Sequence, residues 1–74
     1  MRLEHRARIF KRLYVTFTLQ LLPDGTTPTG MNVEWDPGRP EVTPRLLKRY
    51  MEERHKFLEQ VSEVLGGPVA VVDL

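Results

Sequence analysis

The clearest pattern in the chain is an alternation of apolar and other residues over positions 13–22. The apolar side chains take every second position, at Leu13, Val15, Phe17, Leu19 and Leu21. Successive side chains of a strand point to opposite faces, so this pattern predicts a half-buried strand. Ile9 and Phe10 extend it backwards, giving an expected strand over about residues 9–22. We expect the basic lead over residues 1–8 to be extended or frayed.

A second, shorter alternation follows a turn. Pro23-Asp24-Gly25 is typical of a turn, because proline fixes its own φ and glycine tolerates positive φ. Met31, Val33 and Trp35 then alternate with polar residues, which predicts a strand over residues 31–35, antiparallel to the first. The polar positions of both strands, among them Tyr14, Thr16, Asn32 and Glu34, are expected to share the outer face of the sheet.

The spacing changes to three and four residues after Thr43-Pro44. Threonine is a good N-cap and proline is tolerated at the first helical position, so a helix is expected to begin here. The apolar stripe contains Leu47, Tyr50, Phe57, Val61 and Val64, with Met51, Leu58 and Leu65 widening it. Gly66-Gly67-Pro68 ends the pattern, which predicts a helix over residues 44–65. A nearly all-apolar strand is expected at residues 69–73.

These elements predict an α+β fold with the order β-β-α-β. The simplest sheet has three mainly antiparallel strands in the order 2-1-3, with the long first strand central and the helix packed on one face. The 74 residues suffice for a single domain over 1–74 with a thin core. The chain has no cysteine, so disulfides cannot strengthen so small a core, and a homodimer is a possible source of stability.

The charges are unevenly distributed. Residues 1–12 are basic and residues 23–42 are acidic, although the net charge is only +1. The helix is cationic at its start (Arg45, Lys48, Arg49) and acidic at its end (Glu59, Glu63), against the helix dipole. This favours an anion-binding site at the helix start. The alternative is that i,i+4 pairs, Lys48 with Glu52 and Arg49 with Glu53, neutralise the pattern.

Arg54 falls within the predicted apolar stripe. Its stem could pack while its head reaches the edge of the core, or the residue could anchor a partner. Trp35 allows the same two interpretations, with a core position favoured. The predicted partner- or anion-binding residues are Arg8, Lys11, Arg12, Arg45, Lys48, Arg49 and Arg54.

Most catalytic signatures are missing from the sequence. There is no glycine-rich phosphate loop before a helix, no cysteine nucleophile, and a single serine, Ser62. His5 and His55 are the only histidines, and Glu34 and Asp36 are expected on a solvated face. We therefore predict no catalytic residues, no metal site and no cofactor.

The leading hypothesis is a non-enzymatic interaction protein, an adaptor or inhibitor that binds a protein partner. Small inhibitors encoded by phages and mobile elements, anti-CRISPR proteins among them, are of this size. The first alternative is a nucleic-acid-binding module that uses a basic patch of Arg2, Arg6, Arg8, Lys11, Arg12, Arg45, Lys48 and Arg49. The second is a small nuclease-type toxin that relies on His5 and His55. No apolar run reaches the length of a membrane span, so a cytoplasmic location is expected.

Overall fold

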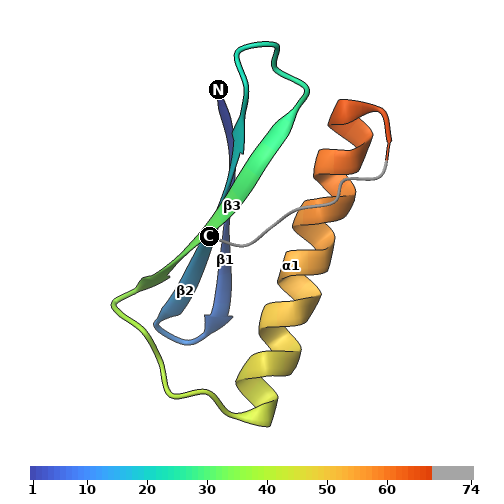
Figure 1. Cartoon of the computed structure of the whole chain (residues 1–74). Helices are drawn as coiled ribbons and strands as arrows, with labels where there is room; N and C mark the ends of the chain where they lie inside the picture. The colour runs from blue at the N-terminus through green and yellow to red at the C-terminus, as the bar shows by residue number, and fades with distance from the viewer. Residues whose placement is uncertain (68–74) are drawn as a thin grey trace.

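A computed structural model describes residues 1–67 of the chain. Three strands, β1 (Arg2–Phe10), β2 (Leu13–Leu21) and β3 (Pro28–Asp36), precede one helix, α1 (Pro44–Leu65). The strands form an antiparallel sheet in the order β1-β2-β3, and α1 lies along one face of it (Figure 1). The α+β class and the single helix on one face are therefore confirmed.

The order of the elements differs from the predicted β-β-α-β. Three strands come first and the helix follows, and the expected strand over 9–22 is divided between β1 and β2. Of the two conformations expected for residues 1–8, the extended one is observed and the frayed one is not, since β1 begins at Arg2. β1 occupies the place beside the central strand that we expected residues 69–73 to fill. That predicted C-terminal strand lies outside the described residues.

The division between β1 and β2 had no turn signal in the sequence. Lys11-Arg12 joins the two strands although neither residue is typical of tight turns. Within residues 1–67, no residue other than glycine has positive φ, and the pairing register shifts between Arg8 and Phe10. A shift in the pairing thus takes the place of the glycine or asparagine that a two-residue hairpin usually needs.

The second hairpin is closed by the predicted turn. Gly25 takes φ of 75°, and the Asp24 carboxylate accepts bonds from the amides of Thr26 (2.9 Å) and Thr27 (3.0 Å) and from the Thr27 hydroxyl. The Thr27 hydroxyl, followed by the two amides, lowers the pKa of Asp24. β3 then runs over Pro28–Asp36, longer than the predicted 31–35.

The helix has the range that the sequence pattern predicts. Thr43 is its N-cap, and the Thr43 Oγ1 accepts a bond from the Leu46 amide at 3.1 Å. Pro44 is the first helical residue. At the other end Gly66 takes a left-handed conformation (φ 79°), and its amide donates to the Ser62 carbonyl.

The core lies between α1 and the faces of β1 and β2. Its fully or nearly buried side chains include Val15, Phe17, Leu19, Met31, Leu46, Phe57 and Val61. The helix face that packs is rotated from the predicted stripe, because Leu47 and Met51 are each 50% exposed and Val64 is 70% exposed. Glu53, which the sequence analysis did not place in the core, is buried, whereas these three apolar residues are exposed.

We expect Ile9→Val to lower the free energy of unfolding by about 0.5–1.5 kcal/mol, because Ile9 is buried and loses one methylene group. Urea unfolding followed by circular dichroism measures this change. The matched control is Val42→Ala, at an exposed position, which should change stability by less than about 0.5 kcal/mol. Equal stabilities of Ile9→Val and the unmodified chain would contradict the assignment of β1 to the core sheet.

Candidate functional site

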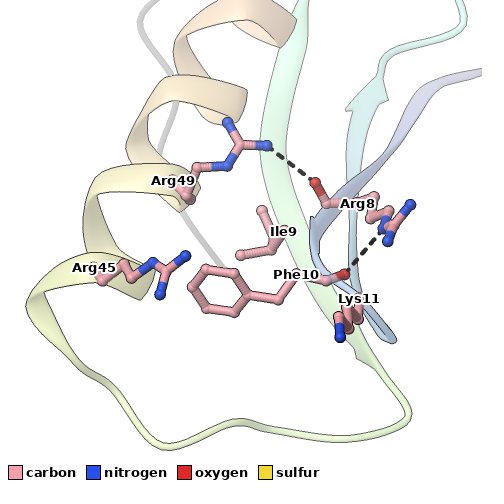
Figure 2. Close-up of a pocket in the computed structure, with 6 residues that line it drawn as sticks. All are labelled: Arg8, Ile9, Phe10, Lys11, Arg45 and Arg49. Atoms are coloured by element: carbon pink, nitrogen blue, oxygen red, sulfur yellow. Dashed lines mark hydrogen bonds between the residues drawn. The ribbon is translucent and has the colours of Figure 1, made fainter.

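The candidate site is an open pocket of about 610 Å³ between the β1–β2 turn and the start of α1. Its lining comes from the end of β1 and the turn on one side and from the first turns of the helix on the other (Figure 2). The six lining residues are Arg8, Ile9, Phe10, Lys11, Arg45 and Arg49. Tertiary packing thus brings the basic N-terminal region to the cationic helix start, which we refer to as the basic pocket.

Four of the predicted binding residues, Arg8, Lys11, Arg45 and Arg49, line the basic pocket. Arg12 and Lys48 are exposed but do not line it. Arg54 is half-buried and nine positions beyond Arg45, which places it on the opposite side of a helix that turns 100° per residue. Arg54 therefore belongs to a different surface.

Arg49 ties the helix to the end of β1. Its Nη2 donates to the Arg8 carbonyl at 3.1 Å, a contact drawn in Figure 2. The same guanidinium pairs with Glu52 at 3.2 Å and Glu53 at 3.4 Å. The proposed Arg49–Glu53 pair is thus present, whereas Glu52 pairs with Arg49 and not with Lys48 among the described residues. Much of the charge of Arg49 is already compensated.

The other cations of the basic pocket are less engaged. The Arg45 guanidinium lies 5.2 Å from the centre of the Phe10 ring, and Figure 2 shows the two side chains facing each other. Arg8 Nε donates to the Phe10 carbonyl at 3.3 Å. Lys11 has no ion pair with residues 1–67. The pocket therefore presents cations beside an apolar floor of Ile9 and Phe10, which suits a ligand with both carboxylate and apolar groups.

The backbone at the helix start contributes little to anion binding. Pro44 has no N–H, and the Leu46 amide is already bound by Thr43. The Leu47 amide donates to the Thr43 carbonyl at 2.9 Å. The cationic side chains therefore make this site, and the Leu46 and Leu47 amides do not contribute to it.

A polar cluster around the buried Glu53, next to the basic pocket, was missed by sequence analysis. The His5 ring lies 5.8 Å from the Phe57 ring, at an interplanar angle of 14°, and 6.4 Å from the Phe17 ring. His5 Nε2 is 3.6 Å from Glu53 Oε2, and Lys56 and Arg49 each approach Glu53 Oε1 to 3.4 Å. Two spacings in the sequence could have indicated that these residues face inward. His5 alternates with Leu3 and Ala7, and Glu53 lies four residues before Phe57.

The surroundings of Glu53 favour its charged form. Burial raises the pKa of the carboxyl, but Lys56, His5 and Arg49 lower it by more, so the pKa lies below its usual value. The cluster joins α1 to β1 through the approach of His5 to the Glu53 carboxylate and through a ring stack. Its effect on the basic pocket is positional, because it holds the helix against the strand that supplies Arg8.

The remaining candidates for chemistry are dispersed. His55 is exposed and pairs with Glu59 at 2.8 Å, and Asp36 pairs with Arg6 at 3.0 Å on the outer face of the sheet. Arg6 also covers the Tyr14 ring, at 4.4 Å from its centre. Within residues 1–67, no three histidine or carboxylate side chains are placed to hold a metal ion. Trp35 is half-buried and packs on Tyr50, with their ring centres 5.6 Å apart.

Comparisons with family models, curated proteins and solved structures find no match. In the part of the chain that the structure describes, no helix is both long enough and apolar enough to cross a bilayer. The functional argument therefore rests on the geometry of the site.

We expect the free energy of unfolding of Glu53→Gln to fall less between neutral and acidic pH than that of the unmodified chain. Because the folded-state pKa of Glu53 is lowered, its carboxylate stabilises the fold at neutral pH. This contribution is lost as the pH falls from the usual value of about 4.3 through the lowered pKa. Urea unfolding measured from about pH 2 to about pH 7, a range that brackets this value, gives the difference.

The matched control for this pH series is Glu63→Gln, at an exposed position near the end of the same helix. This control should follow the acid profile of the unmodified chain. Parallel profiles for Glu53→Gln and the unmodified chain would show that the Glu53 carboxylate does not stabilise the folded state in the way that its surroundings indicate.

Proposed function

We propose that this chain is a small non-enzymatic interaction protein, an adaptor or inhibitor, that binds an acidic surface of a protein partner through the basic pocket. The observation that carries the proposal is the convergence of Arg8, Lys11, Arg45 and Arg49 around one open pocket. These residues come from two segments separated by the whole length of β2 and β3. A cytoplasmic location is part of the proposal.

The make-up of the basic pocket supports a protein ligand. Arginine and aromatic side chains together are typical of the residues that contribute most to protein–protein binding. Here Arg45 lies over the Phe10 ring, and Ile9 adds apolar surface beside it. A carboxylate could accept bonds from the arginines while its aliphatic stem contacts the floor.

Nucleic acid is the second candidate ligand. The observation in its favour is that Lys11, Arg12 and Lys48 are exposed and have no ion pair among the described residues. Phosphate recognition needs such uncommitted cations. Against it, the outer face of the sheet offers no row of exposed aromatics for base stacking, since Tyr14 is half-buried beneath Arg6.

Two double charge reversals test the role of the pocket. Lys11→Glu with Arg45→Glu changes two lining residues, whereas Arg12→Glu with Lys48→Glu changes their exposed sequence neighbours by the same net charge. We expect the first variant to lose at least about tenfold in affinity, roughly 1.4 kcal/mol, and the second to lose much less. Nuclear magnetic resonance titration with an oligoglutamate peptide measures both.

A salt series distinguishes the two ligand classes. The same two variants and the unmodified chain are titrated with duplex and single-stranded DNA at increasing ionic strength. Affinity for DNA that falls steeply with salt, and equally in both variants, would favour the nucleic-acid alternative. Equal losses of oligoglutamate binding in the two variants would contradict a specific role for the basic pocket.

A further inference from the structure

The outer edge of β1 carries a row of backbone groups without a partner strand among the described residues. The Leu21 amide donates to the Met1 carbonyl at 2.8 Å, so Met1 and Leu21 form a hydrogen-bonded pair. In an antiparallel ladder such pairs alternate, and the register pairs Leu3 with Leu19. The odd residues of β1 therefore direct their backbone groups toward β2, and the even residues direct theirs outward.

The outward backbone groups belong to Arg2, Glu4, Arg6 and Arg8. The bond from Arg49 Nη2 to the Arg8 carbonyl agrees with this direction, because a carbonyl within the ladder could not receive it so readily. Arg49 thus caps the edge at its carboxyl end. Within residues 1–67, no strand pairs with the outward N–H and C=O groups of Arg2, Glu4 and Arg6, so these groups can pair with an added strand.

A pocket adjoins each end of this edge. The basic pocket adjoins its carboxyl end, and a smaller pocket of about 140 Å³ adjoins its amino end, between β1 and the last turns of α1. The smaller pocket is lined by Leu3, Glu4, Phe57, Gln60, Val61 and Val64, and we refer to it as the apolar pocket. Its volume is below the roughly 300 Å³ of a small-molecule site, and suits a single side chain.

We propose that β1 receives an extended segment of the partner protein as a fourth strand. One aliphatic side chain of that segment fills the apolar pocket, and an acidic side chain about six residues away reaches the basic pocket. The six steps from Leu3 to Ile9 span about 20 Å along a strand. This inference rests on the proposed function and adds the mode of binding, which is strand addition with side-chain pockets for specificity.

Charge favours an acidic partner segment over a second copy of this chain. The outward residues of β1 are three arginines and one glutamate, and Arg45, Arg49 and Lys11 stand at one end of the edge. A second β1 strand would place like charges opposite one another, which is unfavourable. The other sheet edge, β3, lies on the far side of β2, and neither pocket has a lining residue from it (Figure 1).

The first experiment identifies a binding segment and locates it. A display library of random twelve-residue peptides (a length chosen to exceed the roughly six steps between the pockets) is selected against the protein. We expect enriched peptides to carry an aliphatic and an acidic residue about six positions apart. Amide hydrogen exchange with an enriched peptide should protect the Glu4 and Arg6 amides and leave those of Val33 and Trp35 on β3 unchanged.

The second experiment removes one outward N–H. Arg6→Pro and Arg6→Ala both lose the Arg6 side chain and its pair with Asp36, but only the proline variant loses the amide hydrogen. That amide points away from the ladder, so the sheet should tolerate the proline, and circular dichroism checks this. We expect the proline variant to bind an enriched peptide about tenfold more weakly than the alanine variant.

The third experiment tests the apolar pocket with two exposed helix residues. Val64→Gln alters the pocket lining, and Leu47→Gln makes the same kind of change outside both pockets. We expect only Val64→Gln to weaken binding of the enriched peptide, by about tenfold for the loss of one buried aliphatic contact.

Failure of this inference differs from failure of the proposed function. Equal affinity of the two Arg6 variants, protection of β3 amides, dimerisation through β1 in sedimentation, or a library without enriched peptides would overturn strand addition at β1. The proposed function would still stand if Lys11→Glu with Arg45→Glu abolished binding of oligoglutamate. If Lys11→Glu with Arg45→Glu still bound both oligoglutamate and the enriched peptide as the unmodified chain does, the proposed function itself would be overturned.

Discussion

The stack of the His5, Phe57 and Phe17 rings beside the Glu53 carboxylate is the contact on which the arrangement of the molecule depends. The rings of Phe17 and Phe57 are 5.8 Å apart, and their stacking attaches the middle of α1 to the central strand. His5 extends the stack to β1, and the Glu53 carboxylate on the helix lies 3.6 Å from His5 Nε2. One contact thus joins the helix to two strands at once.

The position of this contact halfway along α1 determines what lies at the two ends of the helix. Toward the start of α1, Arg45 and Arg49 meet the turn between β1 and β2, and the basic pocket forms there. Toward its end, Val61 and Val64 meet the beginning of β1 and enclose the apolar pocket. The two pockets therefore lie on either side of the same packing contacts, at opposite ends of α1.

The cationic start of α1 is a local arrangement that opposes the helix dipole, which favours acidic residues there. Part of the cost is offset locally, because Arg49 is bound by Glu52, Glu53 and the Arg8 carbonyl. Arg45 and Lys48 have no such carboxylate partner among the described residues. A local preference that is broken without full compensation is consistent with a functional surface at this end of the helix.

The sequence by itself determined the elements with strong periodicity. The helix of residues 44–65, its Thr43 cap, the Asp24-Gly25 turn and the burial of Val15, Phe17 and Leu19 all follow from local spacing and local hydrogen bonds. It also indicated all four cations of the basic pocket, since a basic N-terminal region and a cationic helix start are visible without a fold. Residues 1–8 were less certain because alternating arginines fit both a frayed lead and an edge strand.

Only the tertiary structure decided the pairing of β1 with β2, the burial of Glu53 beside a half-buried His5, and the separation of Lys11 and Arg45 from Arg12, Lys48 and Arg54. The Lys11-Arg12 turn lacks the usual turn residues, so its hairpin depends on the register of the whole ladder. A helix stripe that is apolar over a wide arc can pack in more than one rotation. The choice between rotations came from the fit of Phe57 and Glu53 against His5, a contact between residues far apart in the chain.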